Sequence, residues 1–244
     1  MHAAIHLGPG AYAAVLVSVA LGAAIQGSVG FGANLVAVPV LAVVEPEALP
    51  ATLTLLVLPL AVGMVRRERQ GVDWPAVGWL MAGRVPGTVA GSLVVVWVAG
   101  DTLAVLAGAG VLVAVAMSLL TTTVRVSPGT CVAAGAASGA MGTATSIGGP
   151  PLALLYQHQE GPVLRATLAA TFSLGTVLSL AGQVAAGAVA GWHVALAVAL
   201  FPGTLAGLAA SSRLAHRLDG AWLRPAVLAF AAAAATVAVV RGLA

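Results

Sequence analysis

Long apolar stretches separated by short polar segments run through the whole chain. Residues 11–29, 48–65 and 101–122 each supply enough apolar positions for a helix that crosses the bilayer core, which takes about 20 residues. The apolar segments 31–44 and 147–157 are too short for a full crossing, and each follows a run rich in Gly, Ser or Thr. This pattern predicts an all-α integral membrane protein in which two half-helices begin inside the membrane.

The composition supports a membrane location. Of the 244 residues, 60% are hydrophobic and 7% are charged, which leaves too few polar side chains to cover a water-soluble globule. No extended polar tract separates the apolar stretches, so the sequence leaves no room for a soluble domain. Lipid is therefore the expected surroundings of the protein, and a binding site must lie within the membrane or at its edges.

Two parts of the chain resemble each other. The segment Pro86–Gly91 (PGTVAG) recurs as Pro202–Gly207 (PGTLAG), and the Gly-rich segment Gly30–Ala33 aligns with Ser146–Gly149. Matches in the same order along the chain predict a duplication. The expected organisation is one membrane domain made of two transmembrane repeats, residues 1–124 and residues 125–244.

The arginines indicate how these repeats are oriented. The net charge of +3 comes from Arg without any Lys, and positively charged short loops stay in the cytoplasm. The Arg-rich loop of one repeat corresponds to an Arg-free loop of the other, so the two repeats are expected to have inverted topology. Both termini are then expected outside, and the loops expected in the cytoplasm are residues 66–73, 123–127, 158–165 and 213–224.

The two Gly-rich breaks are the expected binding site. A half-helix that begins inside the membrane presents unpaired N–H groups and the positive end of its dipole, and both attract an anion. Two such ends, one from each repeat, are expected to meet near the membrane midplane. The candidate substrate-binding residues at and near the breaks are Gln26, Gly30, Gly32, Asn34, Thr52, Thr143, Thr145, Ser146, Gly148, Gly149 and Thr167. Five other glycines are expected only to permit close helix packing: Gly83, Gly87, Gly91, Gly203 and Gly207.

Arg84 is the further candidate, because it lies well inside an apolar stretch. A charge at this depth is costly unless it faces a cavity or a partner. Two interpretations stay open: Arg84 attracts the substrate anion, or its side chain snorkels to the membrane interface.

No metal or cofactor site is expected. Cys131 is the single cysteine, and the spacing of His158, His193 and His216 fits no zinc motif, so these histidines are expected in solvated loops. Sequence motifs for a dinucleotide or for ATP are missing as well.

Two segments resemble motifs of a known family: GSVGFGANLVAVPVL (residues 27–41) and GTATSIGGPPLALLY (residues 142–156). Together with the length and the duplication, they resemble the TauE/SafE family of sulfite and organosulfonate exporters over essentially the whole chain. The resemblance implies export of sulfite, sulfoacetate or a related small anion.

The expected function is a secondary transporter that exports such an anion by alternating access. It is expected to be a multi-pass protein of a bacterial cytoplasmic membrane, with a small anion and membrane lipid as partners, and without nucleic acid. Whether it forms a homo-oligomer is left open. The alternative is a channel or an uptake permease for another small anion or solute. An intramembrane enzyme is disfavoured, because Arg84 is the one ionisable residue well inside a predicted span.

Overall fold

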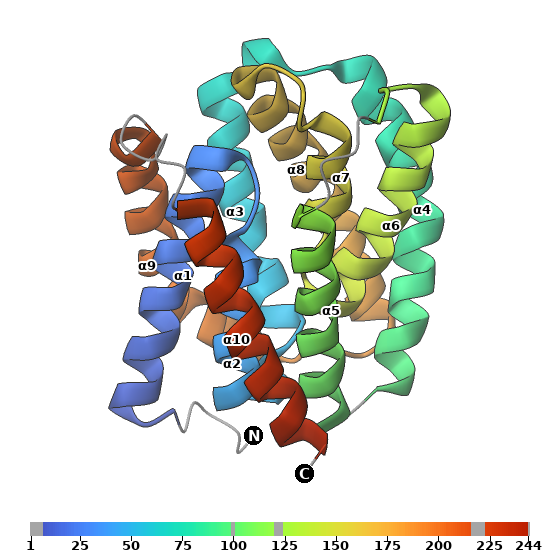
Figure 1. Ribbon diagram of the computed structural model, residues 1–244. Coiled ribbons are helices and arrows are strands. Elements are labelled where there is room, and N and C mark those ends of the chain that lie inside the picture. The colour runs from blue at the N-terminus through green and yellow to red at the C-terminus, as the bar shows by residue number, and fades with distance from the viewer. Residues whose placement is uncertain (1–6, 99–100, 120–123, 216–222, 244) are drawn as a thin grey trace.

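The chain folds into helices that stand side by side as a bundle (Figure 1). The computed structural model describes residues 7–98, 101–119, 124–215 and 223–243, and this part of the chain contains no strand. In chain order the elements are α1 (Pro9–Val29), α2 (Ala33–Val44), the short 3-10 helix η1 (Pro46–Ala48), α3 (Ala51–Glu68), the short 3-10 helix η2 (Arg69–Gly71), α4 (Trp74–Trp97), α5 (Asp101–Leu119), α6 (Pro128–Thr145), α7 (Gly149–Tyr156), α8 (Gly161–Ala185), α9 (Gly191–Ala215) and α10 (Leu223–Leu243).

The two short helices predicted from the sequence are present. Helix α2 has 12 residues and follows a break in which Gly30 and Gly32 have φ angles of 103° and 110°. A residue with a Cβ is strained at such angles, so glycine at these two positions allows α1 to end and α2 to begin a few residues later. Helix α7 has 8 residues and follows Ser146, whose φ is 61°. Pro150 and Pro151 lie in its first turn, where the missing N–H has no intrahelical partner.

Two closely packed helix pairs flank the bundle. Figure 1 shows α1 beside α9 on one side and α4 beside α6 on the other. Between them α3 packs against α8, and α5 packs against α10. The flanking pairs approach closely at glycines: a Cβ on Gly87 would lie 2.1 Å from the Ala136 carbonyl oxygen, and one on Gly207 would lie 2.2 Å from that of Ala20.

The same holds for the other glycines that were assigned to packing. A Cβ on Gly83, Gly91 or Gly203 would lie within 3.0 Å of an atom on the facing helix. The sequence-based prediction of a packing role for these glycines is confirmed.

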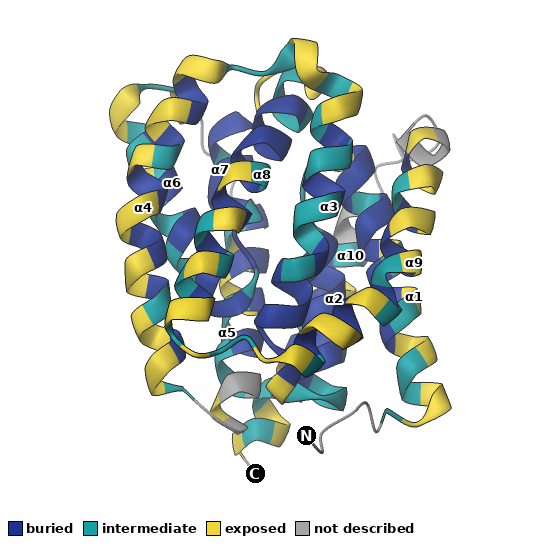
Figure 2. Cartoon of the chain, turned by 180° about the vertical axis from the view of Figure 1, so that it is seen from behind, coloured by how far each residue is buried: buried dark blue, intermediate teal, exposed yellow. Residues whose placement is uncertain are grey.

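Exposed residues lie on the outside of the bundle and buried residues at its centre (Figure 2). Many of the exposed residues carry large apolar side chains. Among the described residues, four helices are long and apolar enough to cross a membrane by themselves: α1, α4, α8 and α9 up to Ser212. The predicted apolar span 48–65 needs correction, because helix α3 begins only at Ala51 and extends into the charged residues 66–68. Of the predicted span 101–122, residues 101–119 form α5, and residues 120–122 lie outside the described residues.

The Arg-rich residues 66–73 lie at one end of the bundle. Residues 66–73 lie at the end opposite to the one where α1 begins and α10 ends (Figure 1). The connection from α7 to α8 also lies at this end, which is called the arginine end below. Trp74 and Trp97 lie at the two ends of α4, and Trp192 lies in the first turn of α9. Part of the predicted loop 213–224 lies outside the described residues, namely residues 216–222, which include His216 and Trp222.

One of the predicted loop histidines is buried instead. His193 is 6% exposed in the first turn of α9, and its Nδ1 accepts a hydrogen bond from the Ala190 N–H at 2.9 Å. Its Nε2 lies 3.0 Å from the Glu47 carbonyl oxygen, to which it donates in the tautomer that Nδ1 implies. The ring therefore joins the start of α9 to η1, while His158 is exposed as expected.

Candidate functional site

The two Gly-rich breaks contact each other inside the bundle. The Asn34 side chain, in the first turn of α2, donates from Nδ2 to the Ser146 carbonyl oxygen at 2.7 Å. On the other side of the breaks, a Cβ on Gly149 would lie 3.1 Å from Cβ of Phe31. Gln26 closes the first break, because its Oε1 accepts from the Ala33 N–H at 3.2 Å. The starts of α2 and α7 therefore lie together, although far apart in the sequence.

A small polar cavity of about 40 Å³ lies where the breaks meet. A buried water needs roughly 10–15 Å³ of such space, so the cavity has room for a group the size of a few waters. We call it the polar cavity. The residues around it are Gln26, Gly32, Asn34, Leu35, Thr54, Val57, Arg84, Gly142, Ser146, Ile147, Gly148, Gly149, Pro150, Phe172, Thr176 and Ser179.

Arg84 brings a positive charge into the wall of this cavity. Its residue is 3% exposed, and its Nη1 donates to the Ser138 hydroxyl at 2.9 Å. That hydroxyl donates in turn to the Gly148 carbonyl oxygen at 2.6 Å, so Ser138 joins the guanidinium to the second break. Arg84 Nε has no hydrogen-bond partner. In the described part of the chain both ion pairs involve Glu68, so no carboxylate neutralises Arg84.

Snorkelling would need an exposed guanidinium, whereas Arg84 is 3% exposed and lies in the protein interior. Two glycines make the room that it occupies. A Cβ on Gly175 of α8 would lie 2.0 Å from Arg84 Nε, and a Cβ on Gly142 of α6 would lie 3.3 Å from Nη2. The fold therefore reserves a space for this cation between α4, α6 and α8.

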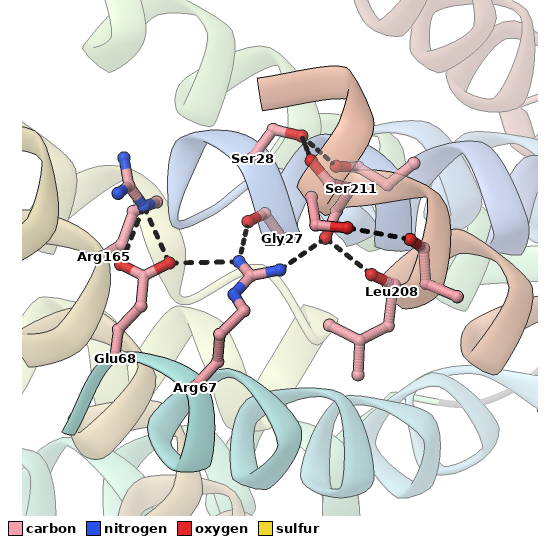
Figure 3. A network of polar contacts seen from close by, with 10 residues as sticks. Gly27, Ser28, Arg67, Glu68, Arg165, Leu208 and Ser211 are labelled. Atoms are coloured by element: carbon pink, nitrogen blue, oxygen red, sulfur yellow. Dashed lines mark hydrogen bonds and ion pairs between the residues drawn. The ribbon is translucent and has the colours of Figure 1, made fainter. Parts of the chain in front are cut away.

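A second group of charges lies at the arginine end. Arg67 donates to the Gly27 carbonyl oxygen and, at 2.8 Å, to the Ser211 hydroxyl (Figure 3). Glu68 accepts from Arg67 at 3.1 Å and forms an ion pair with Arg165 at 2.8 Å. Together these contacts join α1, α3, α8 and α9. Arg67, Glu68 and Arg165 also line a basic recess of about 460 Å³. Arg66 and Arg69 line the same recess.

Comparison with known proteins decides the family. The sequence profile described as "Sulfite exporter TauE/SafE" matches residues 14–238. The chain belongs to the TauE/SafE family. Searches of the curated proteins and of the solved structures found no match. Members of the TauE/SafE family are membrane transporters and not enzymes, so the chain is a multi-pass membrane transporter, and the family implies a small anionic substrate.

In this TauE/SafE transporter, seven of the twelve residues proposed from the sequence line the polar cavity. They come from both breaks and from the middle of α4. The seven are Gln26, Gly32, Asn34, Arg84, Ser146, Gly148 and Gly149.

The other five proposed residues lie outside the wall of the cavity. Gly30 faces Leu164 and Arg165 near the arginine end. The Thr167 hydroxyl accepts from the Asp73 N–H at 3.0 Å, and the Thr145 hydroxyl donates to the Met141 carbonyl oxygen at 2.8 Å. The remaining two are Thr143, which bonds the cavity residue Ser179 at 2.9 Å, and Thr52, which is buried without a partner.

The sequence did not point to several hydroxyls that the structure adds. Thr54, Thr176 and Ser179 line the cavity from within α3 and α8. Thr54 lies 2.7 Å from the Ser146 hydroxyl and also accepts from Gln183 Nε2 at 3.1 Å. These residues come from the interior of helices, where no break or charge marks them in the sequence.

Proposed function

We propose that this transporter exports sulfite or an organosulfonate by alternating access, and that the SO₃ group binds in the polar cavity. The observation that carries the proposal is the Arg84 guanidinium, which is buried in the cavity wall without a carboxylate. A buried charge without a partner costs several kcal/mol. A bound anion offsets this cost, so the polar cavity favours an anionic ligand.

Neutral donors around Arg84 complete the proposed anion site. Gln26 Nε2 is buried and has no partner. The hydroxyls of Thr176 and Ser179 line the same cavity. The starts of α2 and α7 add the positive ends of two helix dipoles. An SO₃ group carries a negative charge and three acceptor oxygens, so it matches both the positive charge and the hydrogen-bond donors of the cavity wall.

The proposal includes two inverted repeats, residues 1–124 and 125–244, whose half-helices meet near the membrane midplane. Helix packing supports it: α1 packs on α9 as α6 packs on α4, and these helices occupy corresponding places in the two repeats. The residues that follow α1 and α6, Gly30 and Ser146, both have positive φ. We place the arginine end in the cytoplasm of a bacterial cell and both termini outside the cytoplasmic membrane, as the positive-inside rule requires.

A channel or an uptake permease is the alternative. A channel needs a continuous water-filled path, whereas the polar cavity measures only about 40 Å³. Its small size supports a carrier that closes around its substrate. Association into a homo-oligomer stays a prediction.

The experiment is sulfite flux in proteoliposomes. The wild-type protein is expected to show saturable sulfite transport with counterflow, which a channel lacks. Arg84→Gln should lower kcat/KM for sulfite by about 10- to 100-fold, because a hydrogen bond to a charged group contributes roughly 1.5–3 kcal/mol. Arg84→Lys keeps the charge and should retain part of the activity.

Arg241→Gln is the matched control, since Arg241 is exposed in the last turn of α10. It should transport sulfite like the wild type. Equal flux in Arg84→Gln and Arg241→Gln, at equal amounts of reconstituted protein, would refute the proposed role of Arg84. Absence of sulfite or sulfonate transport in the wild type would refute the function.

A further inference from the structure

A second and larger cavity adjoins the polar cavity. It measures about 270 Å³ and lies between α1, α2, α5, α7 and the starts of α8 and α10. Of the described residues around it, only Ser118 and Gln157 carry polar side chains, and none is charged. Phe31, Met117, Ala153, Leu154, Val227 and Leu228 form much of its apolar wall. We call this space the apolar annex.

The annex and the polar cavity share part of their walls. Gly32, Leu35 and Pro150 line both. These residues belong to the starts of α2 and α7, where the two breaks meet. Because Gly32 has no side chain, the partition is thin at this point. A ligand whose anionic group lies at Arg84 can therefore extend its remaining atoms toward the annex.

The two volumes suit the two parts of an organosulfonate. At about 40 Å³ the polar cavity accommodates little more than an SO₃ group, since one water needs roughly 10–15 Å³. An organic group must lie elsewhere. The annex of about 270 Å³ exceeds the roughly 150 Å³ of an engineered apolar cavity that binds benzene. A chain of about five carbons or a phenyl ring fits into it.

The chemistry of the annex limits which organic group it takes. A carboxylate or an ammonium group there would lose its hydration without finding a charged partner. Sulfoacetate, which carries a second anionic group, is therefore a poor match. An alkyl or aryl group gains free energy by leaving water.

We propose that the annex binds the organic group of an alkyl- or arylsulfonate, so that sulfonates with an apolar tail are the preferred substrates. This inference rests on the proposed function for the position of the SO₃ group. It goes beyond that function because it distinguishes among sulfonates.

The test is calorimetric binding to the full-length protein in lipid nanodiscs. The ligands are methanesulfonate, propanesulfonate, pentanesulfonate and sulfoacetate. The dissociation constant should fall about three- to fourfold for each added methylene, as burial of a CH₂ group predicts. Pentanesulfonate then binds on the order of 100-fold more tightly than methanesulfonate, and sulfoacetate binds more weakly than propanesulfonate. Pentyltrimethylammonium, with the same tail and the opposite charge, should not bind.

Two variants fill the annex from different sides. Val227→Phe on α10 and Ala153→Phe on α7 should each weaken pentanesulfonate binding by at least tenfold and leave methanesulfonate binding unchanged. Val237→Phe is the matched control, because Val237 lies on α10 and is 47% exposed on its outer surface. It should bind the whole series like the wild type.

The outcomes separate this inference from the proposed function. A wild-type dissociation constant that does not change with tail length overturns the annex proposal, even if sulfite is transported. Equal binding of pentyltrimethylammonium also overturns it, because the cavity would then hold any apolar chain, a lipid tail included. A steep dependence on tail length without sulfite flux supports the annex and refutes sulfite transport.

Discussion

The C-terminal ends of α1 and α6 each have a carbonyl oxygen that needs a hydrogen-bond donor, and the donor side chain differs between the two ends. Each helix stops at a break, and a carbonyl oxygen in its last turn accepts a hydrogen bond from a side chain. At the end of α1 the Gly27 carbonyl accepts from Arg67 of α3. At the end of α6 the Thr143 carbonyl accepts from Gln183 of α8 at 2.9 Å.

The difference follows from burial. The Arg67 side chain is 32% exposed and lies beside Glu68 at the arginine end (Figure 3). There a cation keeps contact with water and adds favourable charge at a helix C-terminus. Gln183 is 0% exposed, and its Nε2 also donates to Thr54 at 3.1 Å. A neutral amide satisfies the carbonyl at this buried site without the cost of a buried charge.

Exchanging the two donor side chains should therefore change the free energy of unfolding by unequal amounts. Gln183→Arg buries a cation that has no carboxylate among its described contacts, and it should lower the free energy of unfolding by about 3–5 kcal/mol. Arg67→Gln keeps a donor for the Gly27 carbonyl and should cost no more than about 1 kcal/mol. Thermal unfolding of the purified variants in one detergent measures both.

The comparison fails if the two exchanges destabilise the protein equally. Gln183→Ala checks the reason. It leaves the Thr143 carbonyl without this donor and should cost about 1–3 kcal/mol, which is less than the charged variant.

The backbone at the two breaks gives a second, smaller contrast. At Gly30, φ is 103°, and a Cβ would lie 2.8 Å from Leu164 Cδ2, so Gly30→Ala should cost about 2 kcal/mol. Ser146 has a φ of 61° and donates from its hydroxyl to the Pro50 carbonyl oxygen at 2.8 Å. Ser146→Gly relieves the backbone and loses that bond, so the net change should stay below about 1 kcal/mol.

Gly78→Ala controls for the glycine substitution itself, because Gly78 is exposed within α4 and a Cβ there meets nothing within 4 Å. It should be neutral or slightly stabilising. A loss at Gly78 as large as at Gly30 would show that the left-handed backbone is not the cause. The same unfolding measurement serves for all three variants.

These contrasts show what the sequence could and could not predict. The predicted half-helices 31–44 and 147–157 correspond to α2 (Ala33–Val44) and α7 (Gly149–Tyr156). They were predictable because Gly and Pro change the backbone locally, whatever the tertiary structure.

The hydroxyls of Thr54 and Thr176 were not predictable. In a chain that is apolar on all sides, hydrophobic periodicity does not separate the inner face of a helix from its lipid-facing side. Thr171 and Ser173 look similar in sequence, yet each hydroxyl only donates to a carbonyl of its own helix, at 2.8 Å. The role of Gly175 was hidden for the same reason, because the space it leaves for Arg84 depends on how α8 crosses α4.

The smallest expected effect concerns the ion pairs at the arginine end. Glu68→Gln removes the carboxylate that Arg67 and Arg165 share. Since these side chains are partly exposed, the loss should be below about 1 kcal/mol. It should shrink further at 1 M salt, where the screening length falls to about 3 Å. The loss caused by Gln183→Ala should not change with salt, because that site is buried and its contacts involve no ion. Parallel salt series of the two unfolding midpoints make the comparison. A Glu68→Gln loss that persists at 1 M salt would mean that Glu68 acts through packing or hydrogen bonds, and charge would then no longer distinguish the two helix ends.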